Sequence, residues 1–76
     1  MNESIIQSLT ERCEDALAFM QRRKDAIQLM IYVRGEERDK MREDNSFINQ
    51  YGQNGLVVRY KKGRFEEDFI IFERKK

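Results

Sequence analysis

The sequence predicts a single α+β domain, with helix in its N-terminal part and a β-hairpin at its C-terminal end. Apolar side chains recur at helical spacing near the N-terminus, whereas residues 56–72 form two strand-like runs around Lys62-Gly63. The chain has 76 residues, which is the size of one domain with a small core. We therefore expect residues 1–76 to fold as one unit, with the antiparallel hairpin packed on a long or broken helix.

The first expected element is a helix that starts at about Ser4. Ser4 and Gln7 have the spacing of a capping box, in which each side chain bonds the backbone N–H of the other residue. Apolar residues then recur every three or four positions, as in the buried stripe of an amphipathic helix. The stripe consists of Ile5, Ile6, Leu9, Cys13, Ala16, Leu17 and Met20. Because the chain has no histidine to activate the Cys13 thiol, we expect Cys13 to be a structural residue.

The middle segment, Asp25 to Arg34, fits two templates. As a helix it continues the near-heptad series Ile6, Leu9, Cys13, Ala16, Met20, Ile27 and Met30. As a strand it shows the alternation of Ile27, Leu29, Ile31 and Val33. We favour the helix because its pattern covers the longer window. A three-stranded sheet is the alternative.

A charged run and a turn separate this segment from the hairpin. Gly35 is expected to end the middle element, and residues 36–45 are dense in charge, which indicates a solvated helix or loop. Phe47, Ile48 and Tyr51 form a short apolar anchor after this run. The sequence Gly-Gln-Asn-Gly at positions 52–55 is typical of a turn.

The hairpin is the most clearly predicted element. Lys62-Gly63 stands where a tight two-residue turn requires a positive φ angle. This turn would place Tyr60 opposite Phe65. A three-residue loop that ends at Gly63 is the second choice, and it would place Tyr60 opposite Arg64.

The last strand is apolar on both faces, because Phe69 and Ile71 point to one side and Ile70 and Phe72 to the other. The helix covers only one of these faces. A large buried apolar side chain contributes about 1.5 to 3 kcal/mol, so an uncovered face would remove much of a small domain's stability. We therefore expect a homodimer that uses Ile70 and Phe72 for self-association, unless a strand in the middle segment provides the cover within one chain.

A basic cluster marks the tip of the hairpin. It consists of Arg59, Tyr60, Lys61, Lys62 and Arg64, and we predict it to be a partner-binding site. Helices followed by a basic hairpin are also the order of elements in winged-helix DNA-binding domains, where the hairpin approaches the DNA backbone. However, residues 36–51, which would supply the recognition helix, are rich in Glu and Asp, and phosphates repel these side chains. The charges also fit a solvated turn that deters edge-to-edge sheet association.

Composition narrows the classes of function. The net charge is +1, from 15 cations and 14 anions, and it indicates neither nucleic acid nor membrane as a partner. The chain has one cysteine and no histidine, which excludes an internal disulfide and a Cys/His zinc site, and we expect no cofactor or metal. The apolar runs are too short for a membrane span and the N-terminus lacks a signal-peptide pattern, so we expect a cytoplasmic protein.

The sequence contains no catalytic motif, and we expect the protein not to be an enzyme. The leading interpretation is a small protein-binding or regulatory protein of the adaptor or inhibitor type, because a chain of this size offers a surface and little interior. The alternative is a winged-helix-like DNA-binding protein that uses the basic hairpin tip. A helical dimerisation module ranks third, and a hydrolase or nuclease ranks last.

Overall fold

The computed structural model describes residues 2–75, and it describes side chains from Ser4 onwards. Its elements are α1 (Asn2–Arg22), β1 (Gln28–Arg34), α2 (Gly35–Glu43), the 3-10 helix η1 (Ser46–Tyr51), β2 (Leu56–Lys61) and β3 (Glu67–Arg74). The three strands form one antiparallel sheet in the order β1-β3-β2. The predicted α+β class and the C-terminal hairpin are therefore confirmed.

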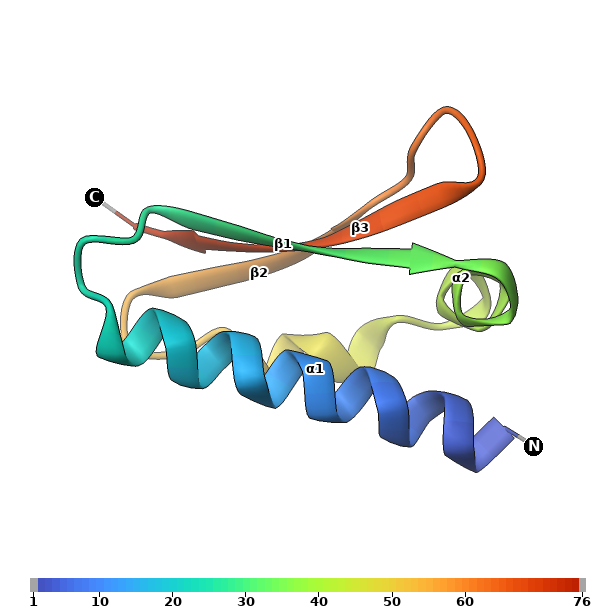
Figure 1. Ribbon diagram of the computed structural model, residues 1–76, viewed down its shortest axis with the longest axis horizontal. Helices are drawn as coiled ribbons and strands as arrows, with labels where there is room; N and C mark the ends of the chain where they lie inside the picture. The colour runs from blue at the N-terminus through green and yellow to red at the C-terminus, as the bar shows by residue number, and fades with distance from the viewer. Residues whose placement is uncertain (1, 76) are drawn as a thin grey trace.

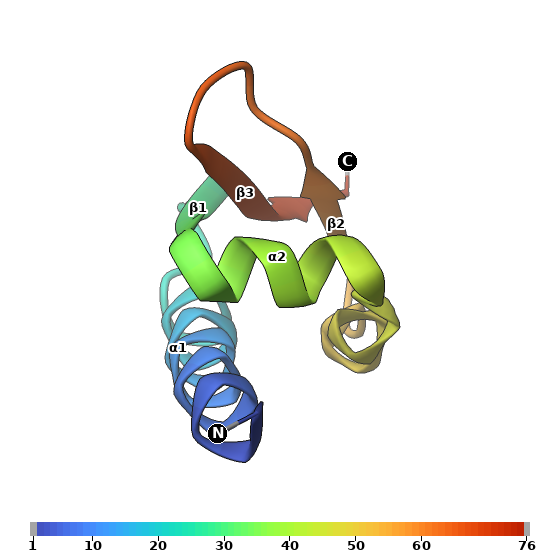
Figure 2. The same ribbon diagram turned by 90° about the vertical axis from the view of Figure 1, so that its right-hand side faces the viewer.

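The molecule has two layers. Figure 1 shows the sheet lying above the long helix α1, and Figure 2 shows η1 beside α1 on the same side of the sheet, with α2 running across one end. We call the sheet face toward α1 the inner face and the opposite one the outer face. None of the described helices covers the outer face.

The core lies between α1 and the inner face. Leu9, Cys13, Ala16 and Met20 of the predicted stripe are buried, whereas Ile5, Ile6 and Leu17 are half-buried at its margin. The sheet, α2, η1 and the start of β2 contribute the other buried apolar residues, which are Ile31, Val33, Met41, Ile48, Tyr51, Leu56, Ile70 and Phe72. The helix begins at Asn2, two residues before the expected start, so Ser4 lies within it.

The favoured helix in the middle segment is wrong, because residues 28–34 form strand β1. Their burial alternates, with Ile31 and Val33 facing the core and Met30 and Tyr32 facing outward. Strand β1 also supplies backbone partners for one side of β3, which a helix cannot do. The near-heptad series consequently ends at Met20, and Ile27 and Met30 are 72% and 41% exposed.

The charged run forms helix α2, as one of the two expected forms, and Met41 is its buried residue. Gly35 follows β1 directly and has a φ of 59°, in the left-handed region that favours glycine. The predicted turn at 52–55 is also present. Asn54 and Gly55 have positive φ angles there, and the Leu56 N–H donates to the carbonyl of Gln53 at 3.0 Å.

Both predicted hairpin registers are wrong. Tyr60 lies opposite Ile70, and Lys61 lies opposite Phe69, so residues 62–66 form a longer loop than either prediction allowed. Gly63 does not have the positive φ that the tight turn required. Glycine is needed at this position for a different reason, because a Cβ atom would collide with the carbonyl oxygen of Glu67.

The two faces of β3 are both covered within one chain to a large extent. Ile70 and Phe72 point to the inner face and are completely buried, so they are not available for a contact with a second copy. Ile71, on the outer face, is only 2% exposed and lies between Met30 and Arg59 in the sheet register. We gave a strand in the middle segment as the alternative way to cover the last strand within one chain. The fold uses this alternative.

Candidate functional site

The hairpin projects beyond the rest of the fold and ends in residues 62–66, which we call the tip loop. Figure 1 shows it standing above the plane of the other elements. Phe65 in this loop is 84% exposed, which is the largest value among the exposed large hydrophobic residues of the described chain. Because burial of a phenylalanine side chain is favourable, a partner that covered the Phe65 ring would gain binding free energy.

The structure separates the five predicted tip residues. Arg59 lies on the outer face and pairs with Glu73 at 2.7 Å, and Tyr60 is half-buried on the inner face. Lys61, Lys62 and Arg64 are exposed next to Phe65. None of these three cations forms an ion pair within the described part of the chain. The structure thus reduces the predicted cluster to three cations and adds Phe65.

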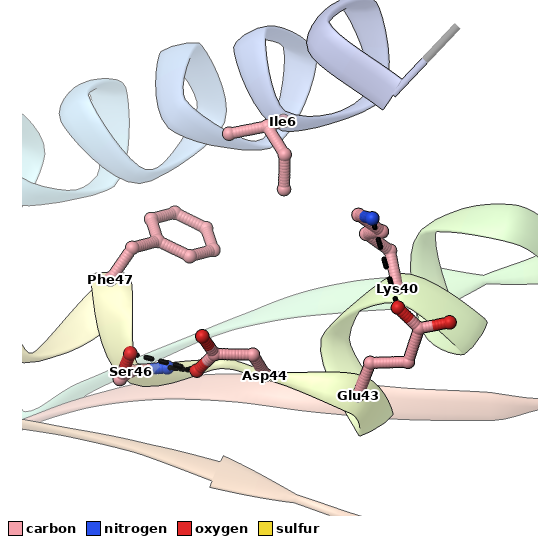
Figure 3. Close-up of a pocket in the computed structure, with 6 residues that line it drawn as sticks. All are labelled: Ile6, Lys40, Glu43, Asp44, Ser46 and Phe47. Atoms are coloured by element: carbon pink, nitrogen blue, oxygen red, sulfur yellow. Dashed lines mark hydrogen bonds and ion pairs between the residues drawn. The ribbon is translucent and has the colours of Figure 1, made fainter.

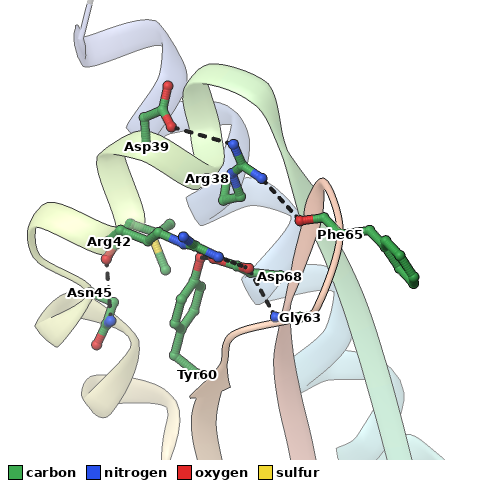
Figure 4. A network of polar contacts seen from close by, with 9 residues as sticks. Arg38, Asp39, Arg42, Asn45, Tyr60, Gly63, Phe65 and Asp68 are labelled. Carbon is green, nitrogen blue, oxygen red and sulfur yellow. Dashed lines mark hydrogen bonds and ion pairs between the residues drawn. The ribbon is translucent and has the colours of Figure 1, made fainter.

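A buried carboxylate supports the loop from below. Asp68 is completely buried on the inner face of β3, and it accepts two hydrogen bonds from the guanidinium of Arg42, at 2.7 and 2.8 Å. It also accepts from the Tyr60 hydroxyl at 2.6 Å and from the Gly63 N–H at 3.0 Å (Figure 4). A buried charge requires such partners, because its transfer from water is otherwise very costly.

These contacts fix the protonation of the network. The hydrogen bonds from Arg42 hold the pKa of the Asp68 carboxyl well below its usual range, and those from Tyr60 and Gly63 act in the same direction. Burial, followed by the hydrogen bond to Asp68, raises the pKa of the Tyr60 hydroxyl. Neither group exchanges a proton near neutral pH, so the network is suited to holding the loop and not to acid–base catalysis.

Helix α2 also holds the loop from the side. Arg38 donates to the carbonyl oxygen of Phe65 at 3.3 Å, and its guanidinium lies 3.9 Å from the carboxylate of Asp39. The loop backbone is therefore bound at Gly63 through Asp68 and at Phe65 through Arg38 (Figure 4). The Phe65 ring points away from this network in the same view.

A shallow hollow of about 390 Å³ lies next to Phe65 and is lined by Arg34, Phe65, Glu66 and Glu67. The Arg34 guanidinium pairs with the Glu67 carboxylate at 2.6 Å across it. The lining of this hollow therefore carries one cation and two anions next to the exposed ring. A lining of mixed charge attracts a polyanion less strongly than a cluster of cations does.

A second hollow, of about 270 Å³, lies between the start of α1, the end of α2 and η1 (Figure 3). Its polar groups bind each other, since Lys40 lies 3.7 Å from Glu43 and Asp44 accepts from the N–H and hydroxyl of Ser46. These bonds from Ser46 lower the pKa of Asp44, which keeps its carboxylate ionised. Ile6 and Phe47 form the apolar part of this hollow, and no pair of its side chains forms an acid–base arrangement.

Three further results concern the rest of the described chain. Burial raises the pKa of the Cys13 thiol to about 11, so this side chain is protonated at neutral pH and packs as an apolar residue. Over the described residues, no group of three or more His, Cys, Asp or Glu side chains is placed to hold a metal ion. Among the described residues, no helix has the length and apolar character that a membrane crossing requires.

Comparison with known proteins yields no match to a family model, to a curated protein or to a solved structure. Function must therefore be inferred from the residues of this chain alone.

The sequence did contain signals for the residues that our prediction missed. Phe65 is a large apolar residue between Arg64 and Glu66, but the predicted register placed it in a strand opposite Tyr60. Asp68 has the same strand parity as Ile70 and Phe72, so an acid at a core-facing position was visible in the pattern. Its partner Arg42 lies 26 positions away, and no local pattern connects the two residues.

Proposed function

We propose that this chain is a non-enzymatic protein-binding or regulatory protein, of the adaptor or inhibitor type, and that the tip loop is its docking element. The observation that supports this proposal is Phe65, a phenylalanine that is 84% exposed on a loop fixed at two points of its backbone. Aromatic side chains that enter a partner's pocket carry much of the binding free energy in protein interfaces. A loop that is already ordered loses less conformational entropy on binding.

The surroundings of Phe65 indicate the chemistry of the partner. Lys61, Lys62 and Arg64 are exposed without ion pairs among the described residues, and they favour acidic groups around the pocket that receives the ring. Glu66 is exposed in the same loop and favours a basic group nearby. The proposed partner surface is an apolar pocket with a mainly acidic rim.

Winged-helix-like DNA binding remains the alternative, and the observation in its favour is the three tip cations that form no ion pair among the described residues. Two features weigh against it. The element before the hairpin is η1, whose sequence Ser-Phe-Ile-Asn-Gln-Tyr contains no cation and buries Ile48 and Tyr51. One short 3-10 helix offers little surface for the major groove, which such domains usually contact with an α-helix.

Two earlier expectations stay predictions. The cytoplasmic location is one of them. The homodimer is the other. It was expected from the near-heptad stripe and from the two apolar faces of the last strand, and both have an explanation within one chain. The stripe ends at Met20, and β1 helps to cover Ile71. A homodimer would have to use the outer face, where Met30, Tyr32 and Val57 are exposed.

Site-specific photo-crosslinking tests the docking role. A photoreactive phenylalanine at position 65, in cells that make the protein, should give a discrete protein adduct. The same group at position 32, where Tyr32 is also exposed but lies on the sheet, is the matched control. Adducts of equal yield from both positions, or none from position 65, would contradict the proposal.

The partner identified in this way allows a quantitative test. Phe65→Ala should weaken its binding by about 10- to 100-fold, which corresponds to about 1.4 to 2.7 kcal/mol. The thermal stability should stay within about 0.5 kcal/mol, because the Phe65 ring is exposed and its backbone contacts remain. Tight duplex DNA binding that falls steeply with salt, and loses this slope in a Lys61→Ala, Lys62→Ala, Arg64→Ala variant, would instead support the DNA alternative.

A further inference from the structure

We propose that the open edge of β2 binds an extended acidic segment of a protein partner as a fourth strand of the sheet. This inference rests on the proposed protein-binding function, and it adds the form and charge of the partner segment. Addition of a strand to a sheet edge is a general mode of peptide recognition, in which backbone hydrogen bonds supply affinity and side chains supply specificity.

The alternation of hydrogen bonds along β2 and β3 shows which backbone groups of β2 do not bond to β3. Gly55 lies opposite Lys75, whose N–H donates to its carbonyl at 2.8 Å, and bonded pairs recur at every second residue of an antiparallel ladder. Val57, Arg59 and Lys61 therefore direct their backbone groups to β3. Val58 and Tyr60 direct their N–H and C=O groups away from β3, toward the edge.

A side chain occupies the opposite edge of the sheet at one carbonyl. The N–H of Arg74 donates to the carbonyl of Ile27, so Ile27 and every second residue after it on β1 bond to β3. Met30 and Tyr32 lie between these bonded residues, and their backbone groups point away from the sheet. Arg12 of α1 donates to the outward carbonyl of Tyr32 at 3.3 Å, and it is held there by Glu37 at 2.9 Å. In the described chain no side chain donates to or accepts from the edge-facing backbone groups of Val58 and Tyr60 on β2, so β2 is the more accessible edge for a partner.

Part of the β2 edge is also covered. A Cβ atom at Gly52 would lie 3.7 Å from the carbonyl oxygen of Leu56 and 4.0 Å from the nitrogen of Val58, so the chain after η1 runs beside the first half of β2. Figure 2 shows β2 at the margin of the sheet with η1 below it. The open stretch begins at the Val58 carbonyl and includes both backbone groups of Tyr60.

The charges beside this stretch specify an acidic occupant. Lys61, Lys62 and Arg64 follow it directly and have no ion-pair partner in the described chain, whereas Arg59 is already paired with Glu73. A second copy would bring the same cations to the same edge, and their repulsion opposes edge-to-edge pairing. An extended segment with Glu or Asp at alternate positions places its carboxylates beside these cations.

The test uses a synthetic fluorescent peptide of alternating Glu and Val as the probe, together with two forms that are N-methylated either at every Glu or at every Val. Alternate amides of a bound strand face β2, so one methylated form should lose at least about tenfold in affinity and the other should bind like the parent. Equal binding of both forms would overturn the inference. So would no binding of the parent at about 1 mM and low salt.

Amide hydrogen exchange locates the pairing on the protein. The parent peptide should slow exchange of the Tyr60 amide and leave those of Lys61, which already faces β3, and Tyr32, on the other edge, unchanged. A Lys61→Glu, Lys62→Glu variant should bind at least about tenfold more weakly, whereas Lys24→Glu, at an exposed turn distant in sequence, should bind normally.

Binding without protection of Tyr60, or with protection of Tyr32 instead, would also overturn the inference. Crosslinking from position 65 remains the separate test of the docking role. A crosslink from position 65 without protection of the Tyr60 amide would contradict only the addition of a strand to β2. Protection of the Tyr60 amide without such a crosslink would contradict only the docking role of Phe65.

Discussion

At the scale of single residues, Asp68 has the largest influence on the tip loop. Its buried carboxylate joins α2, β2 and the loop, through Arg42, Tyr60 and Gly63. Removal of one member leaves buried polar groups without partners, which costs more free energy than the net value of the bonds. We expect Asp68→Ala to destabilise the fold by roughly 3 kcal/mol, near the lower limit for a broken buried ion pair because Arg42 is partly exposed.

The pH dependence of stability should report this residue. The pKa of Asp68 is lower in the folded chain than its usual value of 3.8, so the unfolded chain binds the proton more readily. The stabilising contribution is complete above the unfolded pKa and is lost as the pH falls below about 4. The urea concentration at the midpoint of unfolding should therefore decrease in the wild type when the pH is lowered from 6 to 2. The decrease should be smaller in Asp68→Asn. Asp25→Asn, at an exposed acid, should retain the wild-type profile, and equal profiles for both variants would refute this role of Asp68.

Gly63 provides a second prediction at this scale. Its replacement by alanine would place a Cβ against the Glu67 carbonyl, which is backbone and cannot turn aside. We expect Gly63→Ala to cost about 1 to 3 kcal/mol, measured by urea unfolding. Gly52→Ala is the matched control, because its nearest atom would be at an ordinary 3.5 Å. Similar stability of the two variants would show that the loop moves freely.

At the scale of elements, the end of β3 fixes the end of α1. The Arg74 guanidinium donates to the carbonyl of Met20 in the last turn of α1 and to the carbonyls of Arg23 and Ala26 in the turn that follows. The Arg23 carbonyl also accepts from the Ala26 N–H at 3.0 Å. A cation at a helix C-terminus also interacts favourably with the helix dipole. Arg74, at the end of β3, therefore stabilises the C-terminus of α1.

Arg74→Met should consequently destabilise the protein by about 1 to 2 kcal/mol. The loss should be accompanied by faster amide exchange in the last turn of α1, near Arg22 and Arg23. Lys75→Met removes a neighbouring exposed cation and should have little effect on either quantity. Unchanged exchange in Arg74→Met would mean that the helix end is stable without it.

At the scale of the whole molecule, one layer of helices covers one face of a three-stranded sheet. The outer face depends on its own side chains, such as the pair of Tyr32 and Phe69 with ring centres 5.5 Å apart. Ile70 and Phe72, which we expected at a dimer interface, belong to the core instead. Self-association and stability should therefore respond to different residues.

Phe72→Leu tests this separation. The smaller side chain in the core should lower the free energy of unfolding by about 1 kcal/mol. The molecular mass in sedimentation equilibrium should remain that of the wild type at every protein concentration. A change of mass with little loss of stability would instead place Phe72 at an interface.

Local patterns in the sequence were sufficient for much of the fold. The period of Leu9, Cys13, Ala16 and Met20 determined a helix with one buried stripe, because helical side chains three and four positions apart share a face. The two apolar, strand-like runs on either side of Lys62-Gly63 determined a hairpin, again from a local pattern. The cations of the hairpin tip could also be identified from the sequence, because an exposed charge does not depend on a contact with a residue far away in the chain.

Only the tertiary structure decided the features that depend on distant contacts. Residues 28–34 have both a helical and a strand pattern, and pairing with β3 selected the strand because a central strand needs partners on both sides. The hairpin register, with Tyr60 opposite Ile70, goes together with a buried Asp68, and the cation that this burial requires, Arg42, comes from α2. Phe65 was thereby placed in an exposed loop and not in a strand, because contacts between residues far apart in sequence override a local turn preference.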